Sequence, residues 1–158
     1  MPFNEVIMPA FITFGRILFA VIFIASGAMK LLDLPKTADK VNTKVVMTLP
    51  AVVTPYKEQI ETVTGMESKQ LLAIIAGAVE LLCGLLVALN VGARFFALVL
   101  VLFLMAATYY SHDFWNQTGP EASITLIEAL KNVALIGGLF MIAGIGRGPQ
   151  LHNAYTDV

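Results

Sequence analysis

The residues whose types could do chemistry are the charged and titratable ones that stand inside apolar stretches. Carboxylates and histidine can exchange protons, and arginine and lysine can bind the polar head of a ligand. Inside a membrane each ionisable residue costs about 3 kcal/mol on insertion scales, so such residues almost always face a bundle interior or a wet cavity. The candidates for lining a pocket or binding a ligand are Arg16, Lys30, Glu80, His112, Asp113, Glu128, Lys131 and Asn132.

The spacing of these residues predicts which way they face on a helix. Arg16 and Lys30 share one stripe with Ala20, Phe23 and Gly27, because the steps between them are three or four residues. We therefore expect both side chains to lie on the same side of the helix.

Glu80 stands in a stripe with Ala73, Gly77 and Gly84, and small residues of this kind let helix backbones approach closely. The pattern predicts that Glu80 faces protein and not lipid. Two further stripes are expected to carry polar groups to the interior: Thr108 with His112, and Glu128, Lys131 or Asn132, Leu135 and Gly138.

Four apolar segments must position these residues, at about 7–32, 71–89, 95–110 and 124–145. The 158 residues are 58% hydrophobic and only 13% charged, with a mean hydropathy of +0.79, whereas an average soluble domain has about 25% charged residues. Each segment is long enough, or nearly so, to cross a bilayer. The sequence predicts an all-α integral membrane protein: a single domain over 1–158, folded as an antiparallel bundle of four transmembrane helices.

Four spans place both termini on one side of the membrane, which we name face A, and the 33–70 and 111–123 connections on the other, face B. A bacterial inner membrane and a eukaryotic organelle membrane both fit this pattern. Pro35, Pro50 and Pro55 exclude one continuous helix in 33–70, so we expect a long ordered loop with short amphipathic helices at 40–48 and 56–63.

Shorter signals mark the ends of the spans. Asn90 and Gly92 predict a tight turn between the second and third spans. Aromatic residues are enriched at membrane interfaces, and we expect three of them to anchor the end of the third span there: Tyr109, Tyr110 and Trp115.

The depths of the charges predict a pocket that opens towards face B. At about 1.5 Å of rise per residue, Lys30 and His112 lie at that surface, Glu128 lies about 6 Å deep, Glu80 about 14 Å and Arg16 about 24 Å. A contact between Arg16 and Glu80 would close the pocket beneath, and Asp113 could balance the remaining cation. The pocket could receive a quinone headgroup or a lipid headgroup, with no covalent cofactor; alternatively, the charge pairs only hold the helices in register.

Composition also excludes several classes of function. The net charge of −1 and the absence of a basic run argue against nucleic acid as a partner. Cys83 is the only cysteine, so no disulfide, CxxC pair or thiolate metal site is available. His112 and His152 belong to opposite faces of the predicted bundle and cannot share a haem or a metal, and no metal site is predicted. The expected partners are membrane lipid and other membrane-protein chains.

Four short motifs follow one another along the spans: Arg16-Ile-Leu-Phe with Phe23, Gly27 and Lys30-Leu-Leu-Asp33; Glu80 to Gly84 with Gly92; His112-Asp-Phe-Trp115; and Lys131-Asn132 with Gly137-Gly138. In this order they resemble the motifs of the DoxX family of small four-helix membrane proteins. The resemblance covers most of the chain except 33–70. It implies a four-helix antiparallel bundle.

The resemblance implies several functions for one fold. The family takes its name from a small subunit of an archaeal thiosulfate:quinone oxidoreductase, and its bacterial relatives are linked to redox-stress complexes. Related eukaryotic proteins include a receptor-assembly chaperone and cargo receptors. The long 33–70 segment resembles the chaperone-like branch of the family. The leading hypothesis is an accessory subunit of a membrane complex, not catalytic alone. The alternatives are a quinone-reducing membrane subunit of an oxidoreductase, and an assembly chaperone or cargo receptor.

Overall fold

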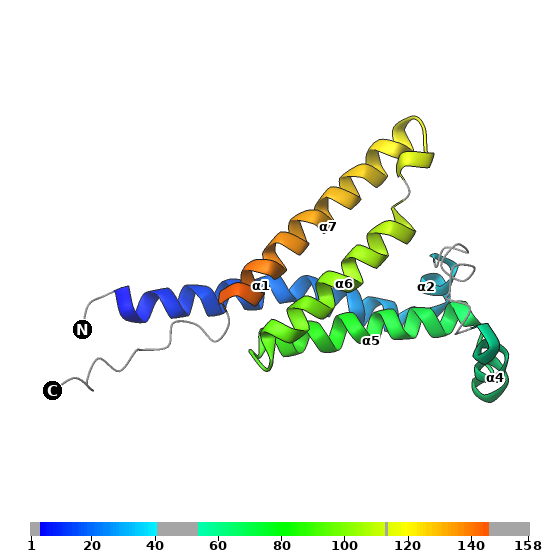
Figure 1. Cartoon of the computed structure of the whole chain (residues 1–158), viewed down its shortest axis with the longest axis horizontal. Helices are drawn as coiled ribbons and strands as arrows, with labels where there is room; N and C mark the ends of the chain where they lie inside the picture. Colours follow the sequence, from blue (N-terminus) through cyan, green and yellow to red (C-terminus); the bar gives the residue numbers. More distant parts are fainter. Residues whose placement is uncertain (1–3, 41–53, 113, 146–158) are drawn as a thin grey trace.

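Helices account for nearly all of the residues that the computed structural model describes, namely 4–40, 54–112 and 114–145 (Figure 1). In chain order they are α1 (Asn4–Leu32), α2 (Leu34–Lys40), α4 (Thr54–Thr64), α5 (Ser68–Ala88), α6 (Ala93–Ser111), the short 3-10 helix η1 (Phe114–Asn116) and α7 (Pro120–Ile145). No strand occurs among these residues, and the all-α prediction is confirmed.

Four of these helices are long and apolar enough to cross a membrane. The candidate spans are Ala10–Leu32, Ser68–Ala88, Ala93–Asn116 and Pro120–Ile145, and each overlaps one of the predicted segments. Large apolar side chains such as Phe11, Leu102 and Met141 are about two-thirds exposed on them, which suits surfaces that face lipid chains. The chain is an integral membrane protein. That both termini lie on one side of the membrane stays a prediction.

Glycines bring α1 and α5 into close contact. A Cβ atom added at Gly27 would lie 2.5 Å from the backbone nitrogen of Leu81 and 2.7 Å from the carbonyl oxygen of Gly77. Gly77 and Gly84 lie against side chains of α1 in the same way. The backbones can approach this far only because small residues stand at the crossing, as the stripe around Glu80 predicts.

The predicted tight turn joins α5 to α6. Leu89 caps α5, and Asn90 and Gly92 both take positive φ angles, 60° and 58°. Glycine adopts this left-handed conformation without the steric cost that a Cβ atom brings, and asparagine tolerates it better than most residues. The turn folds α6 back beside α5, so that the two helices run antiparallel.

The apolar core lies where all four long helices meet. Leu100, Leu139 and Val87 are its largest fully buried side chains, and Ala20 and Phe23 add the contribution of α1. In Figure 1, α6 and α7 run together as a hairpin that diverges from α1 and α5 towards the end where α2 lies. The four helices therefore meet in this core, away from the end where α2 lies.

The 33–70 connection contains two short helices. α2 packs against α5 and buries Ala38, and α4 confirms the helix predicted at 56–63. The other predicted helix, at 40–48, is not tested: Lys40 ends α2, and 41–53 lies outside the described residues. The box formed by Glu67 and Gln70 caps the first turn of α5, because each side chain accepts a hydrogen bond from the other residue's backbone N–H.

Candidate functional site

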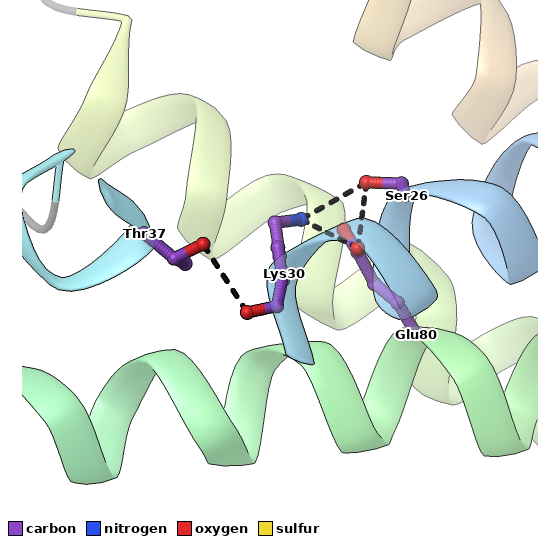
Figure 2. Close-up of polar contacts among 4 residues, drawn as sticks. All are labelled: Ser26, Lys30, Thr37 and Glu80. Atoms are coloured by element: carbon purple, nitrogen blue, oxygen red, sulfur yellow. Dashed lines mark hydrogen bonds and ion pairs between the residues drawn. The ribbon is translucent and has the colours of Figure 1, made fainter. Parts of the chain in front are cut away.

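An ion pair between α1 and α5 is the most buried polar feature of the bundle (Figure 2). Lys30 Nζ lies 2.5 Å from Glu80 Oε2, and Ser26 Oγ donates a hydrogen bond of 2.8 Å to the same oxygen. Lys30 Nζ also donates to Ser26 Oγ at 3.1 Å, which closes the triangle. The Glu80 side chain is 6% exposed and that of Lys30 is 30% exposed. Glu80 thus faces protein, as predicted, and its charge is balanced.

The prediction that Arg16 contacts Glu80 is wrong, because Lys30 forms the ion pair with Glu80 instead. Lys30 stands four residues after Ser26, so both polar groups reach the same point on α5 from adjacent turns of α1. The lysine, placed at the face-B surface by residue count, extends inwards to the carboxylate, near the ring of Phe103 at 5.7 Å. Its flexible four-carbon stem makes this reach possible.

The start of α2 is tied to the end of α1 beside this pair. The hydroxyl of Thr37 shares its one proton between two carbonyl oxygens, that of Lys30 at 3.2 Å (Figure 2) and that of Asp33 at 2.9 Å. Lys36 and Asp33 form an exposed ion pair of 2.6 Å. The ammonium of Lys36 lowers the pKa of the Asp33 carboxyl below its ordinary value, and Asp33 raises the pKa of Lys36 in return. These contacts fix the chain where it leaves the first span.

A second polar group joins α6 to α7. Asn132 Nδ2 donates a 2.9 Å hydrogen bond to Thr108 Oγ1, which itself donates to the carbonyl oxygen of Leu104. Nearer face B, His112 Nδ1 lies 3.3 Å from Glu128 Oε2. The two atoms are close enough for an ion pair when the imidazole is protonated, but they are not aligned for a hydrogen bond, so Nδ1 is buried without one.

Lys131 faces outwards. The sequence placed either Lys131 or Asn132 on the interior stripe of the fourth span, and the structure selects Asn132, while Lys131 is exposed. Glu128, on the same stripe, is only half buried, with a side chain that is 52% exposed. No carboxylate pairs with Lys131 in the described part of the chain. Asp113, expected to balance a cation at the pocket mouth, lies outside the described residues.

Arg16 stands apart from the other candidates, in a groove between α1 and α7. The groove has a volume of about 230 Å³ and is lined by Ile12, Gly15, Arg16, Phe19, Gly138, Met141, Ile142 and Ile145. Arg16 Nε is buried there without a hydrogen-bond partner, and within the described ranges no carboxylate lies within ion-pair distance of the guanidinium. Among the candidates that the structure describes, Arg16 alone lines this groove; whether any candidate binds a ligand stays a prediction.

The three aromatic residues expected as interface anchors lie close to one another. Tyr109, Tyr110 and Trp115 cluster at the end of α6, with ring centroids 5.0 Å apart for the two tyrosines and 6.1 Å for Tyr109 and Trp115. Their role as interface anchors stays a prediction. Among the described residues no three histidine, cysteine or carboxylate side chains gather as a metal site would require, and the Cys83 thiol is buried in the core.

Two features escaped the sequence reasoning. Ser26 could have been found, because it stands four residues before Lys30 and therefore on the same side of the helix. The groove beside Arg16 could not, because it depends on how α7 crosses α1. Gly138 marks that crossing, since a Cβ atom added there would lie 2.5 Å from the ring of Phe19.

Comparison with known proteins agrees with this architecture. The DoxX family model matches residues 11–113, which begin within α1 and extend to the end of α6. A relative from Escherichia coli (strain K12), named "Inner membrane protein YphA", is 27% identical over 84 residues, which are 53% of this chain and 60% of that protein. The chain thus spans less than two-thirds of the length of this curated relative. No solved structure matches the chain. The match to the family model covers well over half of the sequence and reaches three of the four candidate spans, ending before α7, and the chain belongs to the DoxX family.

Proposed function

We propose that this DoxX-family chain is an accessory subunit of a membrane complex, and that it binds a partner chain through the outer side of α7. Lys131 is the observation that carries this proposal. It lies 11 residues after Pro120, the first residue of α7, so it is about 16 Å along a helix that crosses the bilayer. An ammonium exposed inside the span, with no counter-charge among the described residues, is unfavourable.

Because no carboxylate of the described residues lies within ion-pair distance of Lys131, we infer that a group from outside the chain balances its charge. An uncompensated lysine at the middle of a span costs about 3 kcal/mol on insertion scales, and snorkelling recovers only part of this. A carboxylate on a transmembrane helix of a partner would supply the missing charge and a hydrogen bond in a medium of low dielectric constant. Lys30, on α1, already has such a partner in Glu80, and Lys69 stands in the first turn of α5, at the end of its span.

The surface of α7 beside Lys131 has the shape that a partner helix needs. Exposed residues recur there at steps of three, four or seven, and they form a stripe that we call the outer stripe: Ile127, Leu130, Ala134, Gly137 and Gly144. A Cβ atom added at Gly137 or Gly144 would meet nothing within 4 Å, so neither glycine is needed for packing within this chain. Small residues exposed in this way permit close approach of a second helix.

The proposal is tested by the size of the native assembly. Membranes of the native host are solubilised in mild detergent, and the tagged full chain is analysed by native mass spectrometry. We expect an assembly with a different polypeptide, reduced in Lys131→Gln and in Gly137→Leu. Two matched controls should leave the assembly intact. Lys40→Gln removes an exposed lysine outside the spans, and Ala106→Leu places a leucine on the exposed side of α6.

Three outcomes would contradict the proposal. The wild-type chain could appear alone with lipid, it could associate only with a second copy of itself, or the two α7 variants could retain the partner as well as the controls do. Thermal unfolding of each variant separates loss of the partner from loss of the fold.

A second candidate function, the quinone-reducing membrane subunit of an oxidoreductase, is favoured by His112 and Glu128. These side chains form a pair near face B in which the imidazole nitrogen is buried and the carboxylate is half exposed. Reduction of a quinone takes two electrons, which a redox partner must supply, and two protons, which such a pair could pass on. Bound quinone in the purified complex, with electron transfer lost in His112→Ala and the bundle still folded, would support this candidate.

A further inference from the structure

We propose that the groove between α1 and α7 binds one anionic phospholipid from the face-A leaflet, with its phosphate on Arg16 and part of an acyl chain along the groove. This inference goes beyond the accessory role, because it concerns residues other than Lys131 and the outer stripe.

The walls of the groove suit a hydrocarbon chain. Arg16 is the one charged residue among the eight that line it, and the others are glycine or apolar residues such as Ile12, Phe19 and Ile142. A space of about 230 Å³ between two helices that cross the membrane is open to lipid from the side. A soluble phosphate would leave these apolar walls without a partner, whereas the acyl chain of a lipid covers them, which favours a lipid as the occupant.

The charge of the groove suits an anion. The guanidinium of Arg16 is always protonated, and its Nε is buried without a hydrogen-bond partner. Because Glu80 is paired with Lys30, the carboxylate that could have neutralised Arg16 is already used. A phosphate diester can accept two parallel hydrogen bonds from a guanidinium and cancels its charge, whereas a neutral headgroup such as a quinone leaves the charge uncompensated.

The position of Arg16 fits a headgroup at face A. Arg16 is six residues from Ala10, where the candidate span begins, so its Cα is about 9 Å below that end. Side chains on a helix tilt towards the N-terminus, and for α1 this direction leads to face A. Arginine can therefore extend its guanidinium towards the level of the lipid phosphates while its stem lies along the apolar wall.

The test compares two lipids on the purified full chain. The delipidated protein is titrated with phosphatidylglycerol and, separately, with phosphatidylcholine of the same acyl chains, and bound lipid is counted by native mass spectrometry. We expect one phosphatidylglycerol to bind more tightly than phosphatidylcholine. The variant Arg16→Gln should weaken phosphatidylglycerol binding about fivefold, the effect of losing one basic contact to an anionic lipid, and should leave phosphatidylcholine binding unchanged.

Arg94→Gln is the matched control for charge. Arg94 is an exposed arginine at the start of α6, at the same end of the bundle, and it does not line the groove. Its replacement should not change the binding of the tight phosphatidylglycerol. If Arg94→Gln and Arg16→Gln weaken binding equally, the effect is one of general surface charge and the proposal is overturned.

A second variant tests the groove by its volume. A Cβ atom added at Gly15 would meet nothing within 4 Å, so Gly15→Leu fills the groove without striking the backbone of a neighbour. We expect it to abolish the tight binding of phosphatidylglycerol with Arg16 still present, whereas Ala106→Leu should not. Equal affinity of the wild type for both lipids, retention of the lipid by Gly15→Leu, or displacement of the lipid by an equimolar quinone would each overturn the proposal. None of these results depends on whether Lys131 binds a partner chain.

Discussion

Lys30 and Glu80 join the two most closely packed helices of the bundle, with Nζ of one 2.5 Å from Oε2 of the other. Gly27, three residues before Lys30, makes the approach possible, because α5 lies directly against its Cα. The ion pair and the close crossing thus depend on each other. A larger residue at the crossing would push the carboxylate away from the ammonium.

We expect the two members of the ion pair to differ in how much stability their loss costs. Lys30→Met leaves the buried Glu80 carboxylate with Ser26 as its one remaining hydrogen-bond partner and should cost about 3 kcal/mol of unfolding free energy. Glu80→Gln keeps an acceptor oxygen for the Ser26 hydroxyl and the Lys30 ammonium, and Lys30, which is partly exposed, can reach water. This substitution should therefore cost about 1 kcal/mol of unfolding free energy. Unfolding in mixed micelles measures both. The reverse order would contradict this account of the pair.

The close crossing predicts that Gly27→Ala is disruptive. The added methyl would lie 2.5 Å from a backbone nitrogen of α5, which cannot move aside as a side-chain tip can. We expect a loss of about 2 kcal/mol, the cost of overpacking a core, and a lower midpoint of thermal unfolding in detergent. Gly144→Ala is the control, because its methyl meets open space; an equal loss in the two variants would show that the helices do not cross at Gly27.

The hydrogen bond from Asn132 to Thr108 predicts a measurable coupling between α6 and α7. Thr108→Val removes the hydroxyl acceptor, and Asn132→Ala removes the donor. A double-mutant cycle on unfolding free energy should give a coupling of about 0.6 kcal/mol, the average for polar contacts between helices in membranes. Additive effects of the two substitutions would mean that the bond does not contribute to stability.

The exposed pair at the start of α2 predicts a pH-dependent contribution. Because Lys36 lowers the pKa of Asp33 in the folded protein, the folded state binds this proton less readily than the unfolded state does. The stabilisation is therefore complete above the unfolded pKa and is lost as the pH falls through the lower folded value. Carbon NMR of the Asp33 carboxyl should show titration below its ordinary range, moving up towards that range in Lys36→Met. An unchanged titration in the variant would assign the shift to another cause.

Several features of the bundle could be predicted from the sequence because they depend on one helix at a time. Run length and hydropathy located the four spans, and a period of 3.6 residues placed Glu80 on the buried side of its helix with Gly77 and Gly84. The turn at Asn90 and Gly92 follows from local backbone preference. Each of these properties repeats along one segment, and no partner segment is needed to define it.

The pairing of charges depends on two helices at once, and only the tertiary structure decided it. Arg16 and Lys30 share a stripe, so periodicity alone does not decide which of the two pairs with Glu80. The axial register of α1 against α5, set by the contact of Gly27 with Gly77 and Leu81, brings Lys30 to the carboxylate. Arg16, more than 20 Å farther along the helix by its rise of about 1.5 Å per residue, is left beside α7. The place where α7 crosses α1 determines that a groove opens around this arginine. The packing of α7 on α6, which turns Asn132 towards Thr108, leaves Lys131 facing outwards.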